Sequence, residues 1–359
     1  MSSFVKPKID LKNSPKNALG LKRQDYDGVM STLCAGCGHD SVTAAMATAF
    51  YELAIEPHKA VKVSGIGCSS KTTTYFLKEA HGANTVHGRM PSFATGAMAS
   101  NAALTYIGVS GDGDSLSIGI GQMIHAMRRN ANMLYMLENN GVYGLTKGQF
   151  SASADIGSTA KKGAVNEQPP LDPCLMGLAS GATFIARSFS GDRQQLVPLI
   201  KAGLKHKGFA IIDVISPCVS FNDHKGSTKS YAHTYKYYHK AVHADYVPPS
   251  EEIRTAYNEG EVMPVELHDG GHIVLKKLDP DYDPTNRGEA FSKIMDSKNS
   301  DQVLTGLLYL DETQDDMAKQ NNLEARPLNQ IPYSELNPCL LYTSPSPRDQ
   351  RGSRMPSSA

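Results

Sequence analysis

The sequence predicts an α/β fold built on a mostly parallel sheet with helices on both faces. Between residues 39 and 218, short apolar runs alternate with stretches of helical periodicity. This alternation is typical of βαβ units, whose strands lie parallel. Glycine-rich or polar turns follow several of the apolar runs, and ligands of such sheets bind at the carboxyl ends of the strands. The chain has 359 residues, 40% of them hydrophobic, which is enough for a large core.

The expected elements follow one another in a regular order. A first helix is expected at 39–55, with Asp40 or Ser41 as its N-cap. A helix expected at 117–130 places its apolar residues, Met123 and Met127 among them, on one face. The other predicted elements are a strand within 60–70, strands at 103–110 and 132–140, a helix at 172–181, a strand at 182–189, a helix at 192–206 and a strand at 208–218.

Composition divides the chain into four parts. Residues 1–30 read as a basic, extended arm, which is either a mobile tail or an arm packed on a partner. Residues 31–240 hold the predicted sheet. Residues 241–337 are more acidic and polar, and we expect an irregular extension that wraps the main domain or contacts another chain. Residues 338–359 are rich in serine, proline and arginine without periodicity, which predicts disorder. Their resemblance to translated sequencing-adapter reads favours a non-native tail.

The bulk properties exclude several classes of protein. A formal net charge of zero gives no argument for nucleic acid or an anionic membrane as a partner. No apolar run approaches the roughly 18–20 residues of a membrane helix, and the first 30 residues lack the apolar core of a signal peptide. Six cysteines do not make a disulfide framework in a chain of this length. We therefore expect a cytoplasmic protein, in which clustered cysteines point to metal or catalysis.

Two polar motifs follow neighbouring predicted strands. Gly111-Asp112-Gly113 comes directly after one strand, and Asn139-Asn140 ends the next, with one helix between them. The glycines let the backbone approach a bulky anion. Carboxylate, amide and backbone carbonyl oxygens suit Mg²⁺, which would bridge to a diphosphate, and the N-terminus of the intervening helix favours the same anion. Glycine-aspartate pairs are also common turn formers, but the full spacing favours a Mg²⁺–diphosphate site.

Four cysteines form a possible ligand set. Cys34 and Cys37 lie in one loop, and Cys68 and Cys218 follow two separate strands, so the intervening segments have 2, 30 and 149 residues. Four thiolates bind either zinc or an iron–sulfur cluster. Zinc sites usually have two close pairs, so the spacing favours a cluster but leaves zinc, or no common site, open. Cys174 belongs to no pattern and is expected to be a buried structural thiol.

Three further residues have both a functional and an ordinary interpretation. Lys71 ends GIGCSSK, which nearly fits a phosphate-binding P-loop, but Ser70 replaces the second glycine and so disfavours that function. His87, in the His-Gly-Arg sequence before an Ala/Gly-rich helix, is by default a structural histidine. Lys147 lies seven residues after Asn140; it is either a solvated charge or a cation that overhangs the proposed pocket.

The stretch from 111 to 150, which combines these motifs with VYGLTKGQ, resembles the thiamine-diphosphate motif of the 2-oxoacid:ferredoxin oxidoreductases. The resemblance is to the beta subunit, most closely of the 2-oxoglutarate type, and runs from about Cys34 to about Cys218 with a family-like continuation to about 337. It implies a thiamine-diphosphate-binding fold. It also implies oxidative decarboxylation of a 2-oxoacid to acyl-CoA and CO₂, with coenzyme A as co-substrate and electrons passing through a [4Fe–4S] cluster to ferredoxin, reversibly.

The resemblance also implies roles for individual residues. Asp112, Asn140 and the carbonyl of Val142 would bind Mg²⁺, and Cys34, Cys37, Cys68 and Cys218 would bind the cluster. The residues implied to contact the thiamine cofactor are Ile66, Gly67, Cys68, Ser69, His87, Gly88, Gly113 and Asp114. Lys71 would face the substrate. A basic residue at Lys147 suits a distal carboxylate, which favours 2-oxoglutarate over pyruvate.

One catalytic group is missing from the sequence. Thiamine activation usually needs a glutamate, and we cannot place one in this chain; the resembled family supplies it from an alpha subunit. We therefore expect a heterodimer or a dimer of heterodimers. The alternatives are pyruvate or broad 2-oxoacid specificity, a non-redox thiamine-dependent decarboxylase, and a zinc-stabilised binding module.

Overall fold

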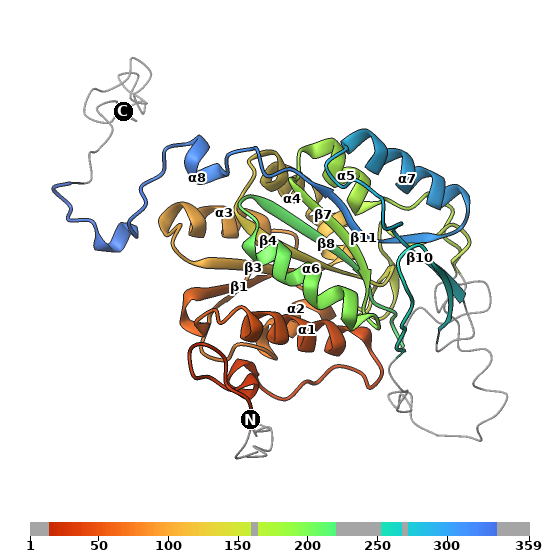
Figure 1. Cartoon of the computed structure of the whole chain (residues 1–359), viewed down its shortest axis with the longest axis horizontal. Helices are drawn as coiled ribbons and strands as arrows, with labels where there is room; N and C mark the ends of the chain where they lie inside the picture. The colour runs from red at the N-terminus through yellow and green to blue at the C-terminus, as the bar shows by residue number, and fades with distance from the viewer. Residues whose placement is uncertain (1–13, 159–163, 220–252, 268–271, 336–359) are drawn as a thin grey trace, which may run out of the picture.

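A nine-stranded sheet runs through the molecule in a computed structural model of the chain, which describes residues 14–158, 164–219, 253–267 and 272–335 (Figure 1). The strand order is β2-β1-β3-β4-β8-β7-β11-β10-β9, and the strands from β2 to β7 in this order are mutually parallel. Their bounds are β1 Ala60–Ser64, β2 His81–Asn84, β3 Thr105–Gly111, β4 Met133–Asn139, β7 Phe184–Phe189 and β8 Phe209–Ile215. The mostly parallel sheet predicted from the sequence is thus confirmed.

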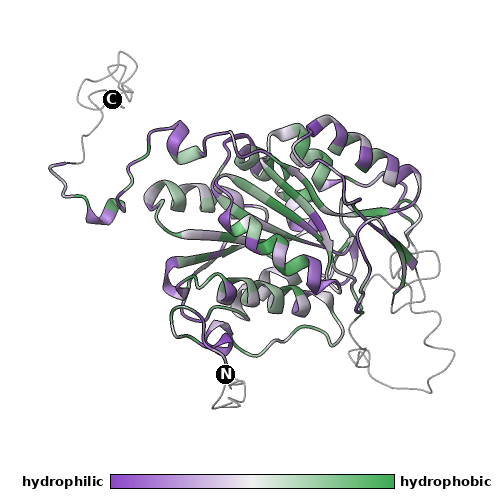
Figure 2. Ribbon diagram, viewed as in Figure 1, coloured by the Kyte–Doolittle hydropathy of each residue, from purple (hydrophilic) through white to green (hydrophobic). Residues whose placement is uncertain are grey.

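Helices cover both faces of the sheet, as predicted (Figure 1). One apolar cluster joins one sheet face to α1 (Gly38–Glu52) and α6 (Arg193–Lys205). A second cluster joins the other face to α3 (Met90–Ser100), α4 (Ile120–Arg128) and α5 (Pro173–Ser180). Figure 2 shows the apolar strands between these layers, with hydrophilic residues on the outer sides of the helices. The core therefore lies on both sides of the central strands β1, β3, β4, β7 and β8, which are themselves buried.

The start of α1 differs from the sequence prediction. The helix begins at Gly38 with Cys37 as its N-cap, and no side chain caps it. Asp40 and Ser41 lie inside the first turn, so the expected N-cap is wrong. The reason is the tight turn from Cys34 to Cys37, closed by a 3.1 Å backbone hydrogen bond, which leads the chain into the helix earlier. The helix expected at 117–130 also begins later than predicted. A π-helical turn, Gly113–Ile118, precedes it, and the α-helix itself is Ile120–Arg128.

The described residues of the N-terminal arm, 14–30, pack against their own chain. The side chain of Tyr26 is fully buried in the cluster that contains α1. The backbone carbonyl of Tyr26 accepts from Leu77 N–H at 2.8 Å, and Gly28 N–H donates to Tyr75 O at 2.9 Å. A Cβ at Gly28 would lie 2.2 Å from Thr74 O, so glycine is required there. The described part of the arm is therefore not a mobile tail, and the alternative of an arm packed on a partner stays a prediction. Residues 1–13 lie outside the described residues.

The region after residue 253 contains regular elements that extend the sheet. β11 (Val303–Leu310) pairs antiparallel with β7, β10 (His272–Lys277) pairs parallel with β11, and β9 (Val262–Glu266) completes the edge. α7 (Arg287–Asn299) packs Ala290 and Ile294 into the same cluster as α5. The expected irregular extension is thus, over its described residues, largely a continuation of the main fold. Short elements follow at α8 (Met317–Gln320) and Leu328–Gln330. The boundary expected at 240 and the tail 338–359 lie outside the described residues.

Within the described ranges, none of the helices combines the length and the apolar character that crossing a membrane requires.

Candidate functional site

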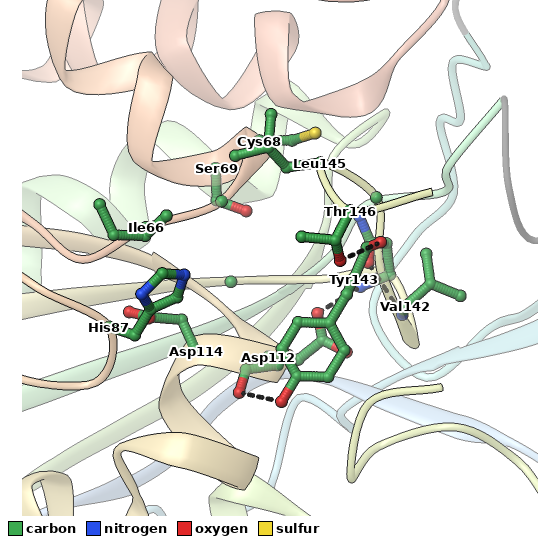
Figure 3. A pocket seen from close by; sticks show the side chains of 15 residues that line it. Ile66, Cys68, Ser69, His87, Asp112, Asp114, Val142, Tyr143, Leu145 and Thr146 are labelled. Carbon is green, nitrogen blue, oxygen red and sulfur yellow. Dashed lines mark hydrogen bonds between the residues drawn. The ribbon is translucent and has the colours of Figure 1, made fainter. Parts of the chain in front are cut away.

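A pocket opens where β1, β3 and β4 end (Figure 3). These three strands are parallel neighbours, so the loops that follow them meet at one edge of the sheet. The pocket is lined by Ile66, Gly67, Cys68, Ser69, His87, Gly111, Asp112, Gly113, Asp114, Asn140, Val142, Tyr143, Gly144, Leu145 and Thr146. The structure thus brings together most of the residues that the resemblance assigned to the cofactor and to Mg²⁺. Gly88, Lys71 and Lys147 are not among the lining residues.

Asp112 is the buried carboxylate of this pocket, 1% exposed. Its Oδ2 accepts from Ser153 Oγ at 2.6 Å and from Ser151 Oγ, and its Oδ1 accepts from the backbone N–H of Asn140 at 3.4 Å. Burial raises the pKa of Asp112 above its usual value, although these hydrogen bonds oppose the shift. A buried negative charge is costly unless a positive charge lies beside it. A divalent cation bound to Asp112 would supply that charge and would stabilise the ionised carboxylate.

Asn140 presents an amide beside this carboxylate. Its Oδ1 accepts from Val142 N–H at 3.1 Å, which fixes the turn after β4. Asp112, Asn140 and the carbonyl of Val142 would supply carboxylate, amide and peptide oxygens, and this donor set fits Mg²⁺. The sequence analysis did not find Ser151 and Ser153, because serines eleven or more residues beyond a motif carry no signal of their own.

The hydrogen bonds continue from Asp112 into the core. Ser153 Oγ, which has a single proton to share between its acceptors, also lies 2.9 Å from Asn139 Oδ1, and Asn139 Nδ2 donates to Asp213 Oδ1 at 3.1 Å. Arg187 pairs with both Asp213 and Asp172 at 2.7 Å. Asp172 in turn accepts from the first backbone N–H groups of α5. One connected network thus joins the pocket carboxylate to the start of a helix.

Tyr143 forms one wall of the pocket, and the sequence analysis did not single it out. Its hydroxyl donates to the Gly113 carbonyl at 2.9 Å, a contact visible in Figure 3. A Cβ at Gly113 would lie 2.6 Å from the Tyr143 ring. The glycine of the motif is therefore required by this close contact.

Asp114 makes its hydrogen bonds to the chain itself. Its Oδ1 accepts from Gly88 N–H at 2.8 Å, and its Oδ2 accepts from Ser110 Oγ at 2.8 Å. A Cβ at Gly65 would lie 1.7 Å from Oδ2, so the carboxylate fills the space that this glycine leaves. The Asp114 side chain thus ties the loop that carries His87 and Gly88 to the end of β3.

Neither of the two candidate substrate lysines is among the residues that line the pocket itself. Lys71 lines a neighbouring cavity of about 370 Å³, which shares Ile66, Gly67 and Leu145 with it. Lys147 is exposed, in a turn closed by Gly148 N–H donating to Tyr143 O at 3.0 Å. Its φ of 77° lies in the left-handed region, which is unfavourable for a residue with a Cβ. The turn is therefore strained at the residue that the sequence singled out.

The four cysteines of the predicted set approach one another at the rim. A Cβ at Gly144 would lie 3.3 Å from Cys68 Sγ and 3.9 Å from Cys218 Sγ. Burial raises the pKa of Cys37 well above its usual value and that of Cys68 to about 11, and the neighbouring Cys218 and Cys34 add to both shifts. Among the described residues, however, no group of three or more His, Cys, Asp or Glu side chains has the geometry to hold a metal ion.

A buried histidine lies beneath these cysteines and was missed by the sequence analysis. His39 is fully buried and is hydrogen-bonded to Ser69 and Ser216. Burial lowers its pKa to about 4, so the ring is neutral near pH 7. Glu138, also fully buried, lies 3.5 Å from His39 Nδ1, and burial raises the pKa of its carboxyl well above the usual value. A contact such as the one between His39 and Ser216, which spans 177 residues, is not visible in a single sequence.

Comparisons with known proteins identify the class of the fold and its pocket. Residues 65–214 match the model of the thiamine pyrophosphate enzymes' C-terminal TPP binding domain. The fold is therefore that of the thiamine-diphosphate-binding proteins. The 2-oxoacid:ferredoxin oxidoreductase subunit beta of Saccharolobus solfataricus is 41% identical over 211 residues, which are 58% of this chain and 67% of that protein. The chain belongs to the family of 2-oxoacid:ferredoxin oxidoreductase beta subunits.

Two further comparisons refine this assignment. The 2-oxoglutarate synthase subunit KorB of Methanocaldococcus jannaschii is 37% identical over 56% of this chain and 74% of its own length. A solved 2-oxoglutarate:ferredoxin oxidoreductase from Magnetococcus marinus, with 2-oxoglutarate, coenzyme A and succinyl-CoA bound, superposes with a TM-score of 0.67 at 28% identity, covering 89% of this chain and 92% of that chain. Across the curated relatives, the matched share of their length ranges from 51% to 74%.

Proposed function

We propose that this chain is the beta subunit of a thiamine-dependent 2-oxoglutarate:ferredoxin oxidoreductase, which converts the 2-oxoacid to acyl-CoA and CO₂ reversibly. The observation that carries the proposal is the buried Asp112 carboxylate beside Asn140, at the carboxyl edge of three parallel strands. Bound thiamine diphosphate supplies the carbon nucleophile for decarboxylation. Asp112, Asn140 and the Val142 carbonyl would hold Mg²⁺, and Gly113 would allow the diphosphate to approach the backbone.

The proposal gives the remaining pocket residues positioning roles. Ile66, Gly67 and Ser69 contact the cofactor from the loop after β1, and His87 reaches it from the loop that Asp114 holds in place. His87 is exposed on the rim, and it would donate a hydrogen bond to the bound cofactor, with Gly88 beside it. None of these roles requires a group to titrate.

We also propose that Cys34, Cys37, Cys68 and Cys218 bind a [4Fe–4S] cluster. Cys68 Sγ and Cys218 Sγ both lie near Gly144, Cys34 and Cys37 come from one neighbouring loop, and four thiolates are the donor set that a [4Fe–4S] cluster takes. Cys68 also lines the thiamine pocket, so an electron acceptor there would lie beside the cofactor. Binding requires the thiols to lose their protons. Zinc remains the competing occupant, and iron analysis of the anaerobically purified protein separates the two.

The site needs a second chain in this proposal. Among the described pocket-lining residues the carboxylates are Asp112 and Asp114, and both are engaged within the chain. The glutamate for thiamine activation is then supplied by an alpha subunit. Val86, Phe93, Ile118 and Leu145, which are 70%, 47%, 44% and 48% exposed, are large apolar side chains close to the pocket residues in sequence. Exposed apolar surface of this kind suits a protein interface.

The substrate is proposed from charge. Lys147 in its strained turn and Lys71 in the neighbouring cavity are cations beside the pocket, and they suit the two carboxylates of 2-oxoglutarate. Coenzyme A would accept the acyl group and ferredoxin the electrons. Broad 2-oxoacid specificity is the second candidate, because the relative in Saccharolobus solfataricus is named for 2-oxoacids in general.

The test uses the chain expressed anaerobically with its alpha subunit. The proposal predicts about four irons per beta chain, bound thiamine diphosphate, and turnover of 2-oxoglutarate that depends on coenzyme A and ferredoxin. The beta chain alone should be inactive. Lys147→Ala should lower kcat/KM for 2-oxoglutarate more than for pyruvate, and Lys205→Ala, an exposed lysine at the end of α6, serves as the control. A colourless, iron-free complex that decarboxylates 2-oxoacids without ferredoxin would instead identify a non-redox decarboxylase.

A further inference from the structure

A single buried imidazole lies under the loops that carry the four cysteines. His39 is the second residue of α1, and its side chain is fully buried. Nδ1 lies 2.7 Å from Ser216 Oγ, and Nε2 lies 3.1 Å from Ser69 Oγ. Both ring nitrogens are therefore used, toward hydroxyls on opposite sides of the ring. A neutral ring offers one donor and one acceptor, and a hydroxyl can serve as either.

The three residues of this arrangement lie on three separate cysteine-bearing segments. His39 follows Cys37 by two residues, Ser69 is next to Cys68, and Ser216 precedes Cys218 by two. The two hydrogen bonds span 30 and 177 residues of sequence. One side chain thus connects every segment of the proposed cluster site.

The backbone on both sides of these hydrogen bonds is closely packed, so the bonds fix the segments relative to one another. A Cβ at Gly38 would lie 2.6 Å from Ser216 Oγ and 2.4 Å from Ser190 Oγ, so α1 docks against these serines without spare room. Ser216 N–H donates to the Asn139 carbonyl at 2.8 Å, which anchors the segment before Cys218 to the end of β4. The ring therefore connects one anchored segment to another.

We propose that His39 is a positioning residue that sets the relative placement of the three cysteine-bearing segments for cluster binding. The inference rests on the proposed function, because it requires the iron–sulfur cluster. Partners of this kind, one step removed from the ligands, typically change metal affinity 10–100-fold when they are removed. An ordinary buried histidine would affect folding but not the lifetime or the reduction potential of a bound cluster.

The experiment compares variants of the anaerobically prepared complex with its alpha subunit. The readouts are iron and sulfide content, the midpoint potential, and the rate of cluster loss to an iron chelator. His39→Leu removes both hydrogen bonds and should lose the cluster at least about tenfold faster than the wild type. His206→Leu is the matched control: it removes another buried imidazole, which lies 2.7 Å from Thr183 Oγ1, and should keep the cluster.

Conservative variants separate the two hydrogen bonds. His39→Asn places an amide where Nδ1 was and should keep the Ser216 contact, whereas His39→Gln should keep the Ser69 contact. Each should fall between the wild type and His39→Leu. In the His39→Asn background, Ser216→Ala should add a further effect and Ser69→Ala should add much less, because residues that share an interaction are not additive.

The outcomes distinguish the inference from the function on which it rests. A wild-type complex without iron overturns both. A wild-type complex with about four irons, together with a His39→Leu complex of unchanged potential and cluster lifetime, overturns the inference and leaves the function standing. Should His39→Leu fail to fold, Ser216→Ala decides, because it removes only one hydroxyl. Faster cluster loss in that variant supports the inference, and an unchanged rate overturns it.

Discussion

The contact between Gly65 and Asp114 gives a prediction whose size follows from the geometry. The Asp114 carboxylate, 3% exposed, accepts hydrogen bonds from Gly88 N–H and Ser110 Oγ, both at 2.8 Å. Hydrogen bonds to a charged group contribute about 1.5–3 kcal/mol each. Asp114→Ala removes both and leaves two buried groups without acceptors, but it also removes the cost of burying a charge. We expect a net loss of about 2–4 kcal/mol in the free energy of unfolding. Asp114→Asn, which keeps one acceptor oxygen, should lose about half as much.

Gly65→Ala perturbs the same carboxylate from the other side. Its Cβ would lie 1.7 Å from Asp114 Oδ2, and the Gly65 backbone is outside the left-handed region, so the contact itself is the source of the strain. The carboxylate must move and lose the Ser110 hydrogen bond, at a cost of about 1.5–3 kcal/mol. In the Asp114→Ala background the new methyl group has room, so Gly65→Ala should cost close to nothing there.

Urea denaturation of the four proteins in this cycle measures the coupling, and thiamine diphosphate titration reports whether the His87 loop has loosened. We expect a coupling of about 1.5–3 kcal/mol and weaker cofactor binding in each single variant. Additive single and double variants would refute the reasoning, because they would show that Gly65 and Asp114 do not share this space. Unchanged cofactor affinity in a destabilised Asp114→Ala would refute the link from Asp114 to His87.

Three further predictions follow from other contacts. Lys147→Gly should be about 1 kcal/mol more stable than Lys147→Ala, because only glycine relieves a φ of 77°, and equal urea midpoints would contradict this. Ser153→Ala should weaken Mg²⁺-dependent thiamine binding about 10–100-fold by removing a 2.6 Å bond to Asp112, whereas Ser180→Ala at the end of α5 should leave a calorimetric titration unchanged. Burial lowers the pKa of Lys62 to about 8, so between about pH 8 and the usual lysine pKa the unfolded chain binds more protons and wild-type stability should rise with pH. Denaturation at several pH values should show a flatter dependence in Lys62→Met, and parallel curves would disprove the assignment.

The sequence predicts the parallel sheet and the pocket edge because both depend on local patterns. Apolar runs of the right length predicted β1, β3, β4, β7 and β8. The rule that ligands bind at the carboxyl ends of parallel strands is enough to place Asp112 near Asn140. The pairing of distant strands could not be predicted in this way. β11 pairs antiparallel with β7 across more than a hundred residues, and the sequence of 303–310 does not indicate which strand it pairs with.

The site was predictable to the same degree. Most of the residues inside the motifs line the pocket, as predicted. The side chains that support them belong to no motif and could not be identified from the sequence. Ser153 has no motif, and its role comes from a loop that returns to Asp112 over 41 residues. Asp114 looked like a group beside the diphosphate, whereas its acceptor oxygens are directed to Gly88 and Ser110. His39 stands directly after the cysteine loop in sequence, yet its partner Ser216 becomes visible only in three dimensions.

The loop after β4 has a consequence for how this family can diversify or be re-engineered. The same segment presents the Lys147 turn and, a few residues later, Ser151 and Ser153 against Asp112. Through Asn139 and Asp213 its contacts extend to the ion pairs that fix α5. A loop transplanted from a relative to alter substrate preference would therefore also replace the serines that hold Asp112, the carboxylate proposed to bind Mg²⁺. An exchange should therefore transfer the whole loop together with the residues that it contacts. If only the Lys147 turn is exchanged, the new turn is held by serines and a carboxylate that belong to the original protein.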